Sequence, residues 1–165
     1  MQRLKHITLV LVTILSCVGC DQVTKVTAKD VLPRNQVISF AGDLFRLQYA
    51  ENSGAFLSLG ATLPEQLRVS IFTVGASLVV AVALGMLLFK SSLTAGATLG
   101  LSLICGGGIG NLIDRLAYQG HVVDFLNMGV GSFRTGIFNV ADVAITAGTI
   151  LLVVTTRKRE KKSGF

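Results

Sequence analysis

The chain has 165 residues, of which 51% are hydrophobic and 15% are charged, and its mean hydropathy is +0.66. Soluble domains carry about 25% charged residues, so this composition excludes an ordinary soluble domain and indicates a membrane protein with one domain, residues 1–165. The net charge of +6 does not indicate a nucleic-acid partner, because five basic residues crowd the last nine positions. Such a basic tail is typical of a segment that fixes membrane topology.

Four hydrophobic stretches predict membrane-spanning helices, which need about 20 mostly apolar residues. They cover residues 6–26, 67–89, 94–116 and 136–156. Asp21 and Lys25 lie in the last turns of the first stretch and can form an ion pair at i, i+4 spacing. The expected fold is therefore a membrane protein with four transmembrane helices.

Basic residues predict the orientation of these spans. Arg3 and Lys5 precede the first span, Lys90 lies between the second and third, and the basic tail follows the fourth. The positive-inside rule then places both chain ends in the cytoplasm. The two longer connections, residues 21–66 and 117–135, are expected on the extracytoplasmic side.

A small extracytoplasmic β-sheet is expected between the first and second spans. Residues 37–40 and 44–49 alternate in hydrophobicity and are rich in β-favouring side chains. Ala41-Gly42-Asp43 between them is a turn pattern, and residues 52–54 form a second turn that ends the sheet.

The third span contains glycines at helical spacing, including Gly96, Gly100, Gly106 and Gly110. Glycine at i and i+4 lets helix backbones approach closely in lipid, so we expect close helix packing here. A dinucleotide-binding fingerprint is not supported, because Asn111 occupies the position of its last glycine and no strand precedes it.

The three cysteines, Cys17, Cys20 and Cys105, all lie in predicted spans and are expected to be buried, unreactive thiols. A second interpretation stays open for Cys20. The N-terminal segment is similar to a bacterial lipoprotein signal peptide, because it has basic residues, then an apolar run, then Val18-Gly19-Cys20. Cleavage of such a peptide would make Cys20 the lipidated N-terminus. Against it, Cys17 occupies a position where such peptides usually have Leu, and further spans follow.

Polar residues gather near the extracytoplasmic ends of the spans. Helical spacing places Asn111 on one face with Asp114 and Arg115, and Asn139 on one face with Asp142. The two outer connections contribute Asn52 and Asp124. His121 lies close to Asp124, but no cluster of residues at ligand spacing accompanies it, so a metal site is not expected.

Asp124 and Asp142 both lie in apolar surroundings, where an ionised carboxylate is costly and is usually functional. Two close carboxylates can share one proton, so that one takes a proton from water while the other donates to a scissile carbonyl. This chemistry predicts an aspartic protease. The alternative is a small four-helix transporter or channel that uses Asp142 as a coupling site.

Five sequence blocks carry a family resemblance: residues 21–25, 52–56, 107–115, 123–125 and 138–142. With them, in this order, the chain resembles the bacterial lipoprotein signal peptidase family (signal peptidase II), a family of aspartic peptidases. The resemblance implies cleavage of prolipoprotein signal peptides before a diacylglyceryl-modified cysteine, without a metal or cofactor. It also implies a monomeric enzyme of the bacterial cytoplasmic (inner) membrane, in contact with lipid, whose active site lies at the extracytoplasmic face.

The resemblance implies a role for each matching residue. Asp124 and Asp142 match the catalytic aspartates. The positions that support the dyad or hold the substrate are Asn52, Gly54, Asn111, Arg115 and Asn139. The positions that match structural or supporting residues are Asp21, Lys25 and Asp114.

Two positions depart from the family pattern. Phe56 follows Ala55 directly, where the family commonly has a second small residue, and Gly136-Ile137 stands where a proline often precedes Phe138. Both departures concern the rim of the substrate site and the shape of a loop more than the chemistry.

Overall fold

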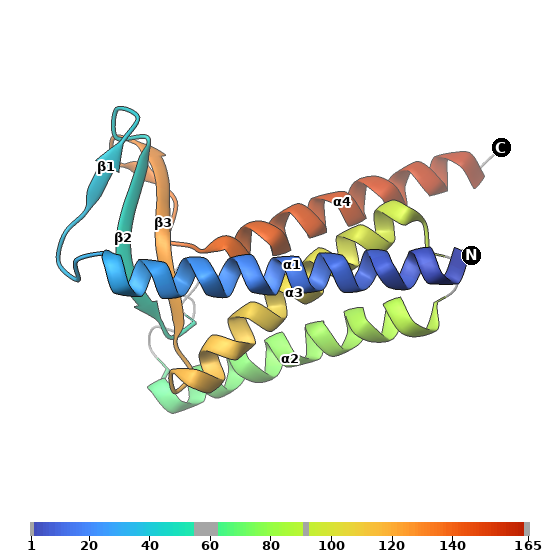
Figure 1. The fold of residues 1–165 in the computed structure, drawn as a ribbon, viewed down its shortest axis with the longest axis horizontal. Helices are drawn as coiled ribbons and strands as arrows, with labels where there is room; N and C mark the ends of the chain where they lie inside the picture. Colours follow the sequence, from blue (N-terminus) through green and yellow to red (C-terminus); the bar gives the residue numbers. More distant parts are fainter. Residues whose placement is uncertain (1, 55–62, 91–92, 164–165) are drawn as a thin grey trace.

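Four long helices dominate the computed structural model, which describes residues 2–54, 63–90 and 93–163. They are α1 (Gln2–Val31), α2 (Glu65–Phe89), α3 (Ala95–Ala117) and α4 (Val140–Ser163). Each of these helices is long and apolar enough to cross a membrane. Figure 1 shows the two chain termini at one end of the bundle and the strands at the other. The predicted four-helix membrane fold is confirmed.

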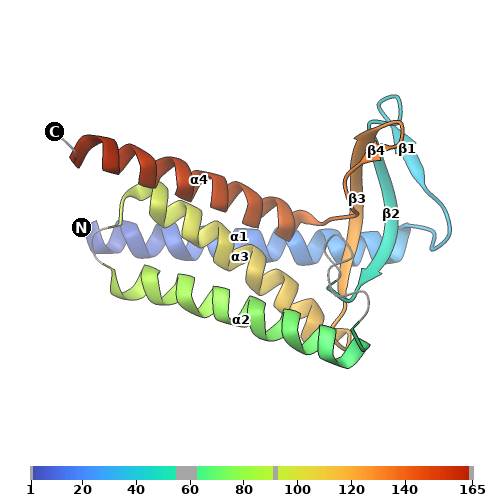
Figure 2. The ribbon, with the colours of Figure 1, turned by 180° about the vertical axis from the view of Figure 1, so that it is seen from behind.

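The glycine-rich helix α3 is the central helix, and it contacts each of the other three helices (Figure 2). Gly100 of α3 faces Gly148 of α4. A Cβ atom added to Gly100 would lie 2.8 Å from the Gly148 carbonyl oxygen, and one added to Gly148 would lie 2.6 Å from that of Gly100. On the other side, Gly106 faces Cys17 of α1. The predicted role of the glycines in close helix packing is therefore confirmed.

Several helix boundaries differ from the predicted spans, including Gln2 at the start of α1 and Ser163 at the end of α4, and two of the differences bear on the site. Helix α1 continues to Val31 instead of ending at residue 26, because Lys25 is paired inside the protein and does not mark the helix end. Helix α4 begins at Val140 instead of residue 136. The preceding Phe138 forms a β-bridge with Leu126, with backbone hydrogen bonds of 2.7 and 2.8 Å, so the backbone there is extended.

The strands form one antiparallel sheet at the end of the bundle away from the termini (Figure 1). Their order in the sheet is β1 (Ile38–Phe40), β2 (Phe45–Asn52), β3 (Val122–Val130) and β4 (Phe133–Arg134). The predicted strands between α1 and α2 are confirmed, but they make only half of the sheet. The strands β3 and β4 come from the connection between α3 and α4, where the sequence predicts only an extended run.

The sheet is fixed to the helices by an apolar cluster. Ala28 at the outer end of α1, Leu32 just beyond it and Phe125 of β3 are buried together. Because Asp124 directly precedes Phe125, this contact also fixes the position of that carboxyl group. The sheet thus brings a segment that follows α3 against the end of α1.

The three cysteines differ in burial. Cys105 is buried, Cys17 is half-buried and Cys20 is exposed on the surface of α1, and all three thiols are free. The expectation that all three are buried is wrong for Cys20, because α1 is packed on one side only and Cys20 lies on the other.

Candidate active site

Asp142 lies in the first turn of α4, where it takes part in a reciprocal helix cap with Asn139. The Asp142 backbone N–H donates to Oδ1 of Asn139 at 2.9 Å, and the Asn139 backbone N–H donates to Oδ2 of Asp142 at 3.1 Å. This is a capping box, in which two side chains three residues apart satisfy the free N–H groups at a helix start. The positive end of the helix dipole also favours a carboxylate there.

Asp124 lies on β3 and is 3% exposed. Its carboxyl group accepts two amide hydrogen bonds, one on each oxygen. Asn139 Nδ2 donates to Oδ1 at 2.7 Å, and Asn52 Nδ2 of β2 donates to Oδ2 at 2.9 Å. Three segments that are far apart in the sequence therefore meet at this carboxyl group.

Burial raises the pKa of Asp124 to about 7, from an ordinary value of 3.8. The negative charge of Asp142 raises this pKa further, while the amide donors of Asn52 and Asn139 lower it. The net effect is a carboxyl group that keeps its proton up to near-neutral pH. Such a shift at a buried carboxyl is typical of an acid–base site.

The two carboxyl groups form one electrostatic unit, which we call the acid dyad (Asp124 and Asp142). Asn139 links them, because its side chain binds Asp124 while its backbone and side chain bind Asp142. Asn139 itself is fully buried. Asn139 thus connects an acid from the second outer connection with an acid from the fourth helix, and the charge of Asp142 acts on Asp124.

Asn111 and Arg115 approach the acid dyad from α3. Asn111 Nδ2 donates to Asp142 Oδ1 at 3.0 Å. The Arg115 guanidinium donates to the Asn111 backbone carbonyl at 3.3 Å, and its charge acts on both carboxyl groups of the dyad. Both residues therefore lie beside the dyad, as predicted.

A second buried polar group lies next to the dyad, and we call it the ion cluster (Asp21, Lys25 and Asp114). The Lys25 ammonium lies 2.7 Å from Asp21 Oδ2 and 3.0 Å from Asp114 Oδ2. The predicted pair of Asp21 and Lys25 is confirmed. Asp114 pairs with Lys25 and accepts the backbone N–H of Val123 at 2.9 Å.

Gly54 shapes the loop after β2 that holds Asn52 in place. Its φ of +100° is in the left-handed region, and an added Cβ would collide with the Phe72 side chain of α2. The Gly54 backbone N–H donates to Asn52 Oδ1 at 2.9 Å, which turns Asn52 Nδ2 toward Asp124. The altered positions of this block, Ala55 and Phe56, lie outside the described residues.

Two features of the site were not predicted from the sequence. Gln22 donates to Asp114 Oδ1 at 2.9 Å and to the Gly110 carbonyl at 3.1 Å, and its i, i+3 spacing from Lys25 was the available signal. The capping box was also readable, because Asn139 and Asp142 have the required spacing. The prediction used that spacing only to place both residues on one face of a longer helix.

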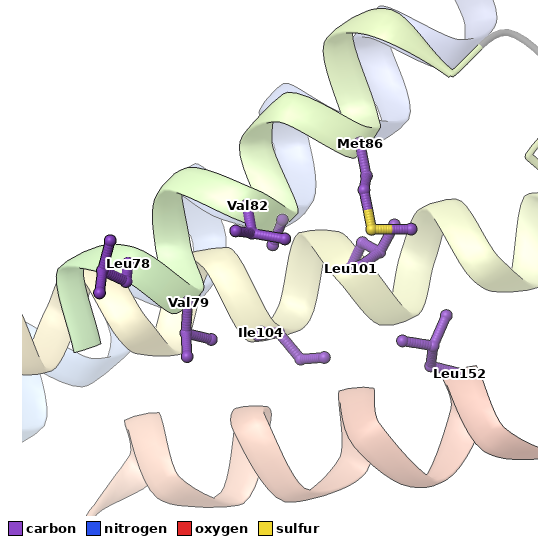
Figure 3. Close-up of a pocket in the computed structure, with 8 residues that line it drawn as sticks. Leu78, Val79, Val82, Met86, Leu101, Ile104 and Leu152 are labelled. Atoms are coloured by element: carbon purple, nitrogen blue, oxygen red, sulfur yellow. The ribbon is translucent and has the colours of Figure 1, made fainter. Parts of the chain in front are cut away.

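An apolar groove runs between α2, α3 and α4, and Figure 3 shows the side chains that line it. It is lined by Leu78, Val79, Val82, Ala83, Met86, Leu101, Ile104 and Leu152. None of these residues has an ionisable side chain, so the groove suits apolar chains and not acid–base chemistry. Within the described ranges, no three His, Cys, Asp or Glu side chains are grouped as metal ligands, and His121 pairs with Glu65 at 3.2 Å.

Comparison with known proteins identifies relatives of the whole chain. The family model described as signal peptidase (SPase) II matches residues 13–158. The lipoprotein signal peptidase of Sphingopyxis alaskensis is 39% identical over 150 residues, which cover 87% of this chain and 82% of that protein. The lipoprotein signal peptidase of Francisella tularensis subsp. novicida is 33% identical, covering 98% and 96% of the two chains.

Solved structures agree with the fold. One bacterial membrane enzyme superposes with a TM-score of 0.80 at 22% identity, covering 93% of this chain and 90% of that one. A second has a TM-score of 0.75 at 23% identity, covering 89% and 91%. At this identity the likeness concerns the fold alone. The alternative of a transporter or channel finds no support in these comparisons.

Proposed function

Because the chain belongs to the signal peptidase II family, we propose that it is an aspartic endopeptidase that removes signal peptides from lipid-modified prolipoproteins. Cleavage takes place before the diacylglyceryl-modified cysteine. The acid dyad is the catalytic pair, and residues 1–165 form a single peptidase domain. The reaction needs no metal or cofactor.

The observation that carries this proposal is the acid dyad, in which two carboxyl groups are held by amides and by backbone N–H groups. In the part of the chain that the structure describes, no cation lies within ion-pair distance of Asp124 or Asp142. The dyad therefore carries an excess of negative charge when both groups are ionised. Sharing one proton relieves that excess, and this is the protonation state that aspartic proteases use.

The environments of the two acids suggest how they divide the reaction. Asp124 is buried and has a pKa of about 7, so it holds the shared proton near neutral pH. Asp142 is only half-buried, so we assign it the role of the proton acceptor. Asp142 takes a proton from water as the water oxygen bonds to the scissile carbonyl carbon, and Asp124 donates its proton to the carbonyl oxygen.

The tetrahedral intermediate then collapses, and the C–N bond breaks. The proton that Asp142 received moves to the leaving amine, and the hydroxyl proton of the intermediate returns to Asp124. The products are the signal peptide with a new carboxyl end and the mature lipoprotein with a free amine. The dyad regains its original single proton, so the cycle balances.

The supporting residues divide into two groups. Asn52, Asn111 and Asn139 donate to the dyad, and Gly54 orients Asn52. Arg115 places a positive charge beside both acids, where it stabilises negative charge on the substrate carbonyl oxygen during the reaction. Asp21, Lys25 and Asp114 hold the elements of the site together.

The placement of basic residues supports an active site at the extracytoplasmic face of the bacterial cytoplasmic (inner) membrane. Figure 2 shows both chain ends, where Arg3, Lys5 and the basic tail occur in the sequence, at one end of the bundle. The strand β3 and the start of α4, which carry the dyad, lie toward the opposite end. The positive-inside rule puts the termini in the cytoplasm. A lipid-modified precursor then reaches the dyad at the outer interface, and the enzyme acts as a monomer surrounded by lipid, without a nucleic-acid partner.

The test is cleavage of a diacylglyceryl-modified precursor by purified wild type and by the Asp124→Asn and Asp142→Asn variants. Each variant should lose cleavage while its yield and unfolding temperature stay close to wild type. Asp30→Asn, an exposed aspartate near the outer end of α1, is the matched control and should cleave normally. Full activity of either dyad variant would refute the proposed mechanism. Loss of activity in Asp30→Asn would show that the assay responds to fold damage alone.

A further inference from the structure

The amide of Asn111 has a single orientation that satisfies its neighbours. Its Oδ1 accepts from the Lys25 ammonium at 2.9 Å and from Asn139 Nδ2 at 3.2 Å. The opposite end, Nδ2, then donates to Asp142 Oδ1 at 3.0 Å. In the flipped orientation, Nδ2 would face two donors and Oδ1 would face a carboxylate oxygen, so three favourable contacts would become repulsive.

Lys25 makes this orientation rigid. An ammonium group is a donor only, so it can face Oδ1 of an amide but not Nδ2. Lys25 is 3% exposed, and its ammonium is held in place by Asp21 at 2.7 Å and Asp114 at 3.0 Å. Asn139, the other donor to Oδ1, is fixed by the dyad itself, because its Oδ1 accepts the Asp142 backbone N–H and its Nδ2 donates to Asp124. Lys25 is therefore the neighbour outside the dyad that fixes the direction of Asn111.

The consequence appears at Asp142. With Asn111 Nδ2 fixed toward it, each Asp142 oxygen accepts one N–H donor, from the Asn111 side chain and from the Asn139 backbone. Asp124 also accepts one donor on each oxygen, so the donors alone do not place the shared proton. Asp124 is the more deeply buried of the two acids, and burial disfavours its ionised form, so the proton resides there. The donor from Asn111 keeps Asp142 oriented as the acceptor of the water proton, as the proposed reaction requires.

We propose that Lys25 is a positioning residue of the acid dyad, which acts through the amide of Asn111 to keep Asp142 the proton acceptor. This inference rests on the proposed function, since it concerns the same dyad. It goes further by giving one member of the ion cluster a role in the reaction, and not only in holding α1 against α3 and α4.

The charged groups around the dyad define what else can move its titration. From α1 they are Asp21 and Lys25, from α3 Asp114 and Arg115, and from β3 and α4 the dyad acids themselves. Lys25 can act on the dyad through Asn111 or through its charge alone. The two routes predict different results when Asn111 is removed.

The experiment is a double-mutant cycle of wild type, Lys25→Met, Asn111→Ala and the double variant, with kcat, KM and the pH–rate profile measured on a diacylglyceryl precursor. We expect Lys25→Met to lower kcat about 10- to 100-fold with little change in KM, since neighbours in one network couple at this level. The acid limb of its pH–rate profile should move to higher pH. In the Asn111→Ala background, Lys25→Met should change kcat less than about threefold and should not shift the acid limb of the pH–rate profile.

Two outcomes overturn the inference. If the kcat losses multiply in the double variant, or if the limb still moves without Asn111, Lys25 acts through packing or through charge and not through the amide. If Lys25→Met lowers only the amount of folded enzyme and the limb stays in place, its role is structural. Asp21→Asn is the control, because it alters the ion cluster but leaves the Lys25 ammonium hydrogen-bonded to Asn111. The acid limb of its pH–rate profile should not move to higher pH.

Lys25→Met can fail to fold, because it leaves two buried carboxylates without their cation. In that case Lys25→Met is combined with Asp21→Asn and Asp114→Asn, so that no charge of the ion cluster is left unpaired, and this triple variant replaces Lys25→Met in the cycle with Asn111→Ala. The dyad variants distinguish a failure of the proposed function from a failure of the proposed role of Lys25. Activity in Asp142→Asn refutes the proposed function, whereas an inactive Asp142→Asn with a multiplicative cycle refutes only the role of Lys25.

Discussion

Two buried polar groups lie side by side in this protein, and each contains two aspartates. In the ion cluster, Lys25 lies within 3.0 Å of both acids, so one of the two negative charges is balanced at contact distance. In the acid dyad, the ligands of the carboxyl groups are amides and backbone N–H groups, and the cation Arg115 acts from a greater distance.

The comparison shows how one residue type serves two purposes in the same apolar surroundings. A buried carboxyl group with a cation beside it can hold elements of the fold together. A buried pair of carboxyl groups without that cation must keep a proton, and this proton is what the reaction needs. The groups next to a buried aspartate therefore determine whether it has a structural or a catalytic role.

The largest expected effect comes from replacing one aspartate of each group by asparagine. Asp124→Asn should lower kcat by at least about 10²- to 10⁴-fold, because the dyad loses its acid. Its unfolding temperature at pH 8 should equal or exceed that of wild type. Asp21→Asn should lower the unfolding temperature and retain kcat within about tenfold. The comparison fails if Asp21→Asn is as inactive as Asp124→Asn while remaining fully folded.

The next effect concerns stability. Lys25→Met should lower the free energy of unfolding by about 3–5 kcal/mol, because it leaves Asp21 and Asp114 buried without a cation. Lys29→Met, one turn further along α1, is the matched control. Its ammonium lies 4.3 Å from the centre of the Tyr118 ring, a contact worth about 1 kcal/mol at a partly exposed site. Denaturant unfolding of the purified variants measures both values, and equal losses would contradict the assignment.

Much of this arrangement could be predicted from the sequence. Long apolar runs gave the helices, and β-favouring alternation gave β1 and β2, because each pattern is local. Helical spacing placed Asp21 beside Lys25 and Asn139 beside Asp142. The acids themselves were conspicuous, since Asp124 and Asp142 interrupt apolar runs.

The remaining features depend on contacts between distant segments. The pairing of β3 with β2 and the approach of Lys25 to Asn111 arise from packing, and no local pattern encodes them. The start of α4 was misplaced by four residues, because Gly136-Ile137-Phe138 is apolar enough to continue a helix and only its bridge to Leu126 shows otherwise. Local sequence patterns thus identify the two aspartates, whereas tertiary contacts determine which residues surround them.

The pH dependence of the dyad gives the third prediction. Asp124 has a pKa of about 7 in the folded protein, against an ordinary value of 3.8. Cleavage should therefore fall about tenfold per pH unit above about pH 7, as the shared proton is lost. Because this pKa is raised, the stability that neutral Asp124 contributes is complete below about pH 4 and is lost as pH rises through 7. Unfolding temperatures from pH 4 to 8 should show this loss in wild type and not in Asp124→Asn.

The smallest expected effect tests how far the dyad depends on the loop after β2. Gly54→Ala introduces a methyl group that collides with Phe72, at a φ of +100° that alanine rarely adopts. The loop must shift, and Asn52 then loses the hydrogen bond that turns its amide toward Asp124. We expect kcat to fall about tenfold, the loss of roughly one hydrogen bond to the Asp124 carboxyl group.

Gly42→Ala separates that effect from backbone strain alone. Gly42 also has a positive φ, of +65°, but an added Cβ meets nothing within 4 Å. Its turn precedes the first residue of β2, whereas Asn52, which contacts the dyad, is the last residue of that strand. Gly42→Ala should lose stability and retain kcat. Equal kcat losses in both variants would mean that the whole sheet, and not the amide of Asn52, transmits the change. A dyad held by amides should respond to the one glycine that orients an amide, whereas a dyad held by a cation would be indifferent to both.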